Sequence, residues 1–102
     1  MDAELFAVGR VVLTDAADDL LSTFNRGPVG REDDVLADLL ERHASGDWGE
    51  VTPATAEANE KALREGGLRL LSVYHLPDAA HVVWVVTEPD RSRTTFLLPD
   101  DL

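Results

Sequence analysis

The spacing of apolar and polar residues divides the chain into extended and helical segments. Residues 5–13 form an apolar, β-branched run of strand length. Apolar positions at helical spacing then predict three amphipathic helices, over 15–24, 32–44 and 53–65. After the last helix the apolar runs become short and are separated by Pro-Asp turns, so strands are expected at 68–76, 81–88 and 93–98.

Capping residues support these helix boundaries. Thr14 stands where the N-cap of the first helix belongs, and Thr52-Pro53 places a cap and a first-turn proline before the third. Gly46 and Gly66 follow the second and third helices, where glycine commonly ends a helix. The boundaries are therefore predicted from local chemistry as well as from periodicity.

The order of the elements predicts the architecture. The short connectors between the last three strands are typical of neighbouring antiparallel strands. Because segment 81–88 is apolar on both faces, we expect it to be central in the sheet and covered at least in part on both sides. The predicted fold is α+β: one N-terminal strand and a three-stranded C-terminal meander form a four-stranded, mainly antiparallel sheet, with three helices packed on one face. Residues 1–102 form a single domain.

Composition narrows the function classes. The chain has no cysteine, which excludes disulfides, thiolate zinc sites and cysteine nucleophiles. It has 9 basic and 20 acidic residues, a formal net charge of −11, so direct binding to nucleic acid is not expected. No apolar run has the roughly 20 residues of a membrane span, and no signal-peptide pattern opens the chain. We therefore expect a cytoplasmic protein with no membrane partner.

Three explanations of the acidity stay open: a solvated surface, adaptation to salt, and imitation of DNA toward a basic protein. The last would make Asp33, Asp34 and Asp38 part of an acidic recognition surface.

The turn at residues 43–49 holds the most conspicuous side chains. Asp47 and Trp48 would form a binding lip, with an indole platform beside a carboxylate. Alternatively, Asp47 bonds nearby backbone amides while Trp48 anchors the connector onto the core. Asn59 lies among apolar positions of its helix and needs buried partners, for which Tyr74, Thr87 and the 45–49 backbone are candidates. A substrate-orienting role for Asn59 is the alternative.

A second polar cluster follows the central strand and comprises Glu88, Asp90, Arg91, Ser92, Thr94 and Thr95. Glu88 and Asp90 are candidates for an acid/base pair or a divalent-ion site, and Arg91 for binding an anion. The alternative is a turn in which Arg91, paired with a carboxylate, pins the hairpin. Trp48 and Asn59 are predicted to contact the region around Tyr74 and Glu88 in one polar-aromatic patch.

The three histidines give no firm metal site. His43, at the end of a helix, would be a metal ligand or base, or else a partner of the helix dipole at the edge of the core. His75 and His81 flank one hairpin and would face each other, without an assured carboxylate beside them. No Ser-His-acid spacing and no glycine-rich phosphate loop occurs. We therefore assign no catalytic residue, no metal and no cofactor.

Four segments together carry a resemblance: HxSGDWG at 43–49, NxxAL at 59–63, RLLSxY at 69–74 and WxxTExDRSxTTxLLP at 84–99. The pattern resembles a small uncharacterised bacterial family of plasmid- and prophage-associated proteins, often labelled plasmid-related protein. The resemblance spans residues 6–99 and implies a mobile-element setting, with no activity attached. The chain departs from the family pattern by ending Pro-Asp-Asp-Leu, where an aromatic residue is expected after the acids.

These observations favour a non-enzymatic, acidic protein-binding module from a mobile element, which interferes with or regulates a host protein that has a basic surface. One alternative is a small metal-assisted hydrolase that uses Glu88 and Asp90. The other is a structural subunit that completes its core as a homodimer.

Overall fold

The computed structural model of the chain describes residues 5–24, 35–76 and 80–101. The elements in chain order are β1 (Arg10–Leu13), α1 (Asp15–Phe24), α2 (Val35–Ala44), α3 (Pro53–Glu65), β2 (Leu70–His75), β3 (Val82–Thr87), β4 (Arg93–Leu97) and a short 3-10 helix, η1 (Pro99–Asp101). None of the helices in these ranges has the length and apolar character needed to cross a bilayer.

Local capping sets the ends of α1 and α3. The Thr14 hydroxyl accepts the N–H of Ala17 at 3.1 Å. The Thr52 hydroxyl accepts the N–H of Thr55 at 3.1 Å, and the N–H of Gly66 donates to the carbonyl of Ala62 at the other end of α3. Both helices span the residues predicted for them. For α2 the predicted end is confirmed, whereas its predicted first residues, 32–34, lie outside the described ranges.

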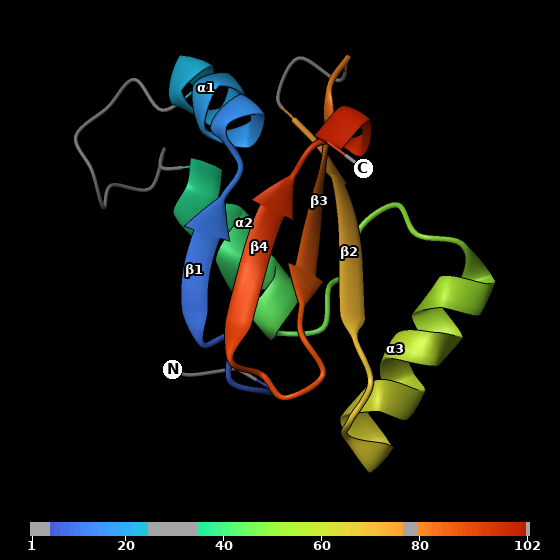
Figure 1. Cartoon of the computed structure of the whole chain (residues 1–102). Coiled ribbons are helices and arrows are strands. Elements are labelled where there is room, and N and C mark those ends of the chain that lie inside the picture. The colour runs from blue at the N-terminus through green and yellow to red at the C-terminus, as the bar shows by residue number, and fades with distance from the viewer. Residues whose placement is uncertain (1–4, 25–34, 77–79, 102) are drawn as a thin grey trace.

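The four strands form one mixed sheet in the order β1-β4-β3-β2. The meander β2-β3-β4 is antiparallel, and β1 pairs parallel to β4 at the edge of the sheet (Figure 1). The predicted α+β fold with a mainly antiparallel sheet is therefore confirmed.

The first strand is shorter than predicted and begins at Arg10. Gly9 has a φ of 67°, and a Cβ built there would lie 2.5 Å from the carbonyl oxygen of Arg91, so only glycine fits this close approach. Before this bend, Leu5 donates its N–H to the carbonyl of Ala44 at 2.7 Å. Phe6 stacks on Trp48, so this part of the apolar run packs beside the helices instead of extending the strand.

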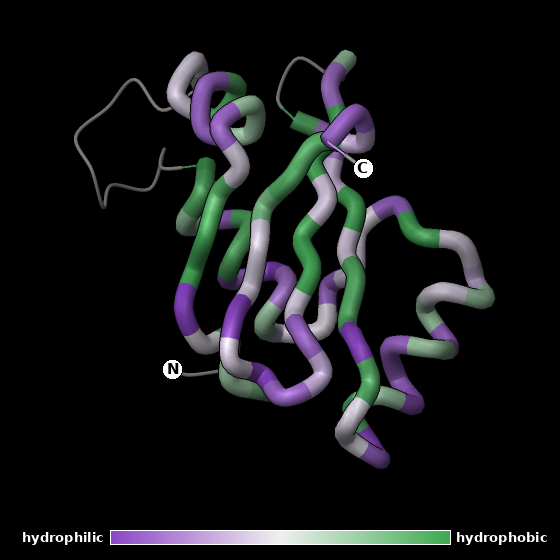
Figure 2. The backbone as a smooth tube through the Cα atoms, in the orientation of Figure 1, coloured by the Kyte–Doolittle hydropathy of each residue, from purple (hydrophilic) through white to green (hydrophobic). Residues whose placement is uncertain are grey.

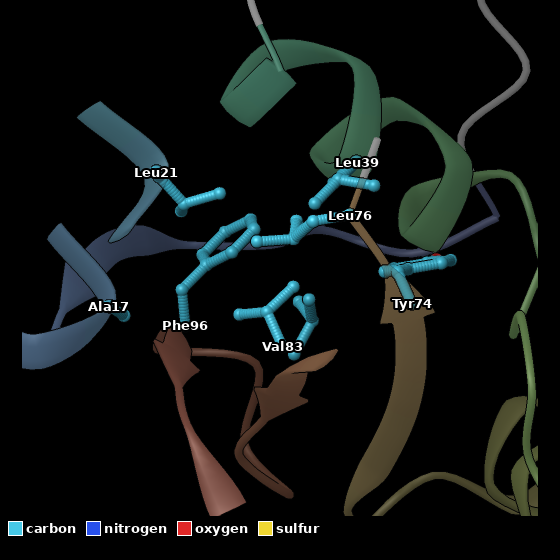
Figure 3. Close-up of a cluster of buried hydrophobic side chains, with 8 residues drawn as sticks. Ala17, Leu21, Leu39, Tyr74, Leu76, Val83 and Phe96 are labelled. Atoms are coloured by element: carbon cyan, nitrogen blue, oxygen red, sulfur yellow. The ribbon is translucent and has the colours of Figure 1, made fainter. Parts of the chain in front are cut away.

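Helices α1 and α2 cover one face of the sheet. Alternate strand residues point toward them, and Ala17, Leu21 and Leu39 of the helices meet Val83 and Phe96 in the main hydrophobic core (Figure 3). The strands form a mostly hydrophobic centre in the hydropathy view, while the helices mix polar and apolar residues (Figure 2). This is the arrangement that the amphipathic helix patterns predicted.

Helix α3 lies along the outer edge of β2 (Figure 1). It adds a second core in which Ala62 packs against Leu70 and Trp48, with Phe6 and Leu63 at its border. All three helices therefore pack on the same side of the sheet, with α3 at the β2 edge.

The other face of the sheet carries no helix among the described elements α1–α3, which lie behind or beside it in Figure 1. We call this surface the open face; its central strand residues are Val12, Leu71, Val73, Val82, Trp84, Val86, Thr95 and Leu97. The outward residues of β3 are only half-buried, whereas its inward residues are fully buried. The central position predicted for this strand is correct, but its helical cover is on one side.

Candidate functional site

The largest group of buried polar side chains is centred on His43, which points from α2 into the sheet. Its Nδ1 lies 2.6 Å from the Ser72 hydroxyl on β2, and its Nε2 lies 2.9 Å from the Thr87 hydroxyl on β3. The Thr87 hydroxyl is 2.6 Å from that of Thr94 on β4, which in turn is 2.7 Å from the carbonyl of Val8. We call these four side chains, His43, Ser72, Thr87 and Thr94, the polar chain; all are fully buried.

The carbonyl at one end fixes the direction of three of the four bonds in the polar chain. Because the Val8 carbonyl can only accept, the Thr94 hydroxyl donates to it, and Thr87 must then donate to Thr94. Thr87 is left to accept from Nε2–H of His43, and if the ring is neutral its Nδ1 accepts from the Ser72 hydroxyl. Of the two neutral tautomers, the geometry therefore selects the one with its proton on Nε2.

Burial lowers the pKa of His43 from 6.5 to about 4, so the ring is neutral at physiological pH. Ser72 and His43 are paired as in a nucleophile–base dyad, but both are buried and the second ring nitrogen meets a threonine, not a carboxylate. The polar chain ties α2 to three strands. The metal-ligand hypothesis for His43 is wrong for this conformation, because hydroxyl groups occupy both ring nitrogens.

The depressed pKa predicts an acid dependence of stability. The unfolded chain binds a proton at His43 near pH 6.5 and the folded chain only near pH 4, so the stabilising contribution present above 6.5 is lost as pH falls toward 4. The loss amounts to about 3 kcal/mol for this group. Urea unfolding of the wild type and His43→Gln at several pH values checks this: the difference between them should shrink across that window. A pH-independent difference would contradict a buried, neutral His43.

Asn59 performs a structural task at the edge of β2. Its amide donates to the carbonyl of Leu71 at 2.7 Å and accepts the N–H of the same residue at 3.0 Å. Both backbone groups point away from β3, so the side chain replaces one step of a missing neighbouring strand. The partner expected from the sequence, Tyr74, Thr87 or the 45–49 backbone, is wrong: the amide binds the strand backbone, which a periodicity argument does not locate.

The segment after α2 covers the next step of the same edge. The N–H of Val73 donates to the carbonyl of Trp48 at 3.0 Å, and the N–H of Glu50 donates to the carbonyl of Val73 at 2.7 Å. Gly49, with a φ of 73°, lies so close to β2 that a Cβ would come 2.1 Å from the Val73 carbonyl oxygen. Trp48 and Asn59 therefore both attach to β2, at Val73 and Leu71.

Trp48 is an internal anchor. It is 7% exposed, stacks on Phe6 at 6.4 Å between ring centroids and meets the His43 ring edge-on at 5.9 Å. Its Nε1–H donates to the Glu60 carboxylate of α3 at 3.1 Å. The indole thus joins α2, α3 and the N-terminal segment, as the structural hypothesis for this turn proposed.

Asp47 and Tyr74 hold the same turn from the other side. The Asp47 carboxylate accepts from Nε of Arg42 at 2.8 Å and from the N–H of Gly49 at 3.2 Å. The Arg42 bond holds the pKa of Asp47 below its usual range. The buried Tyr74 hydroxyl donates to the Asp47 carbonyl, and burial raises the pKa of Tyr74 to about 12. Arg42 also lies 4.5 Å from the centre of the Tyr74 ring.

Arg91 binds backbone carbonyls. Its guanidinium donates to the carbonyl of Leu68 at 2.7 Å, to that of Ala62 at 3.2 Å, and to those of Glu88 and Pro89 in its own turn. The Ala62 carbonyl belongs to the last turn of α3, where the helix dipole favours a cation. The expected pinning of the hairpin is present, but carbonyl oxygens take the place of the carboxylate or anion that the sequence suggested.

Glu88 and Asp90 border an open depression of about 370 Å³ that Pro89, Ser92 and Arg93 also line. Arg69 lies 3.8 Å from the Glu88 carboxylate, and the Asp90 carboxylate accepts the N–H of Ser92 at 3.0 Å. Bonds from Ser92 lower the pKa of Asp90. Among the described residues, no three His, Cys, Asp or Glu side chains gather as a metal site would require.

The sheet register separates the two hairpin histidines. His75 pairs with Val82, so it does not stand opposite His81 as the sequence analysis suggested. Asp38 is exposed on α2, while Asp33 and Asp34 lie outside the described residues.

The sequence analysis did not single out the buried Ser72, and it grouped the buried Thr94 with the second polar cluster instead of with His43. The successive strands β2, β3 and β4 hold Ser72, Thr87 and Thr94 at inward positions. In the sequence, hydroxyl residues at inward strand positions together with a histidine on the inner face of a helix could have indicated this network.

Comparison of the chain with protein-family models, curated proteins and solved structures gives no match.

Proposed function

We propose that this protein is a non-enzymatic, acidic module that binds a partner protein through the carboxylates of α1 and α2. The observation that carries this proposal is the display of acidic side chains on these two contacting helices: Asp15, Asp18, Asp19, Asp38 and Glu41 are all exposed. No ion pair between described residues involves any of them. A basic surface on the partner would supply counter-charges to these carboxylates.

The conspicuous polar residues support the same proposal because they act inside the fold. His43, Asn59, Arg91 and the carbonyl of Asp47 all hold one element to another. Such engaged groups are poorly placed to meet a substrate, whereas the acids of α1 and α2 project into solvent.

The setting of this activity rests on the resemblance of the 43–49, 59–63, 69–74 and 84–99 segments to plasmid-related proteins. We propose a cytoplasmic protein of a mobile element that interferes with or regulates a host protein. Nothing in the charge pattern favours nucleic acid as the direct partner.

Capture from a bacterial lysate tests the proposal. The immobilised wild type should retain one or more basic proteins, and added salt should release them, since exposed charges are screened. The variant Asp19→Asn/Asp38→Asn/Glu41→Gln should retain roughly a tenth as much. The measurement is the amount of each identified protein eluted from the two columns.

The matched control removes the same three charges from another part of the surface. Glu50→Gln/Glu57→Gln/Glu65→Gln alters exposed carboxylates in and near α3 and should leave retention nearly unchanged. If both variants lose captured protein equally, the effect depends only on net charge, which supports the solvated-surface explanation. Retention of the same proteins by both would refute a role for α1 and α2.

The depression beside Glu88 and Asp90 is the observation that favours the alternative, a small hydrolase. Activity of the purified protein on a phosphoester, with added divalent ions, would support it. That activity would also have to disappear in a folded Glu88→Gln variant, because other enzymes can contaminate the preparation.

A further inference from the structure

The open face has the composition of an interface. Val12, Thr95, Val86 and Leu71 form one row across all four strands, and Leu97, Trp84 and Val73 form the next. No residue of these two rows is charged. Leu97 is buried within the single chain and the other six residues are half-buried, so in a chain with a net charge of −11 this face offers an uncharged surface to an apolar partner.

The two ends of the open face carry opposite charge. At the end where β4 begins, the face carries three arginines, Arg10, Arg69 and Arg93, against two acids, Glu88 and Asp90, and Arg69 is paired with Glu88. Arg10 and Arg93 are register partners on β1 and β4 and are exposed. At the end where β4 finishes, η1 follows with Asp100 and Asp101, both exposed. Asp90 already interacts with Arg93 in the same chain, but because paired like charges repel, Arg10 and Arg93 would gain from a further acid.

We propose that the open face binds a second copy of this chain, sheet against sheet, in a two-fold dimer. The two-fold axis runs between the sheets and across the strands, so that β4 of one copy lies antiparallel over β4 of the other. This rotation sets Arg10 and Arg93 of each copy over Asp100 and Asp101 of its partner. A two-fold axis along the strands would instead bring arginines over arginines, so the charge pattern selects one orientation.

The packing is physically reasonable for two twisted sheets. Facing sheets stack about 10 Å apart with their side chains interdigitated. Thr95, Val86 and Trp84 lie near the middle of the face, where water is excluded from the interface. Helices α1 and α2 remain on the outside of both copies, because they cover the opposite face (Figure 1). This dimer does not depend on the proposed acidic surface, which it leaves exposed.

Sedimentation equilibrium over a concentration series tests the dimer. The wild type should sediment at twice the 11.1 kDa mass of one chain. Thr95→Arg places a charge in the middle of each face and should raise the dimer dissociation constant at least about 100-fold. Its control is Thr23→Arg on the exposed surface of α1, which should stay dimeric. A monomeric wild type, or a Thr95→Arg variant as dimeric as the wild type, would overturn the proposal.

A charge swap tests the orientation and remains informative if Thr95→Arg fails to fold. Arg93→Glu alone and Asp100→Lys alone should each weaken the dimer about tenfold. The double variant Arg93→Glu/Asp100→Lys should recover most of the affinity, since each lysine then faces a glutamate of the other copy. Additive losses in the double variant would contradict this orientation. A monomer that binds another macromolecule through this face would exclude the second copy as its occupant.

Discussion

Replacing His43 with alanine is expected to lower the free energy of unfolding by about 3–5 kcal/mol. The change removes a fully buried ring and leaves the hydroxyls of Ser72 and Thr87 without the partner they face. A cavity and unsatisfied buried polar groups each cost free energy, and here both arise at once. Urea unfolding followed by circular dichroism measures the difference at neutral pH.

The control for this change is His75→Ala, since His75 is an exposed residue of β2. That variant should stay within about 0.5 kcal/mol of the wild type. If the His43 variant is as stable as the control but no longer binds the captured partner, His43 belongs to the function and the structural role assigned to the polar chain is wrong.

Replacing Trp48 with alanine should cost about 3–5 kcal/mol, the range for truncating a buried tryptophan. The indole is 7% exposed and contacts Phe6, His43 and, through its Nε1–H, Glu60. Its loss opens the second core and separates α3 from the turn after α2. Thermal and urea unfolding of the purified variant measure the effect.

Trp48→Phe separates the two parts of this contribution. Phenylalanine keeps an aromatic ring but cannot donate to Glu60. The lost hydrogen bond should lower the free energy of unfolding by about 1 kcal/mol, in addition to the loss caused by the smaller ring. A Trp48→Ala variant that unfolds like the wild type while losing its partner would identify Trp48 as a binding platform, the alternative that its sequence context also allows.

Much of the fold was predictable because its signals are local. Thr14 and Thr52 cap the helices they precede, so α1 and α3 begin where the sequence places them. The strands of the meander were predicted from short apolar runs separated by Pro-Asp turns. The shortening of β1 was not predictable, because it depends on Gly9 meeting the backbone of residues 91–92. The parallel pairing of β1 with β4 likewise depends on contacts far along the chain.

The sequence indicated which residues form the candidate site, but not which atoms they bond to. The fold is held together by the turn at 43–49, Asn59 and Arg91, all of which the sequence singled out. Each of them bonds to atoms whose positions a sequence pattern does not predict. His43 meets Ser72 29 residues away and Thr87 44 residues away. Asn59 and Arg91 bind backbone groups, which every residue has, so residue type gives no signal for them. The side-chain chemistry of these residues indicated that they need polar partners, but the identity of each partner is determined by the fold.

The buried hydrogen bonds lie inside the fold, whereas the two proposed binding surfaces lie on its outside. Every buried side-chain nitrogen or oxygen of the described residues has a hydrogen-bond partner. Helices α1 and α2, which carry the proposed acidic surface, pack on the face of the sheet opposite to the open face. A dimer through the open face would therefore present two acidic surfaces, and a partner with two basic sites would bind it more tightly than it binds one copy.

The central claim, recognition by the acids of α1 and α2, is tested most directly by association kinetics with the captured basic partner. At low salt the wild type should associate about tenfold faster than Asp19→Asn/Asp38→Asn/Glu41→Gln, with similar dissociation rates, because long-range attraction acts on encounter. High salt should remove the difference. A difference that lies in dissociation alone, or that the Glu50→Gln/Glu57→Gln/Glu65→Gln control reproduces in full, would contradict the account.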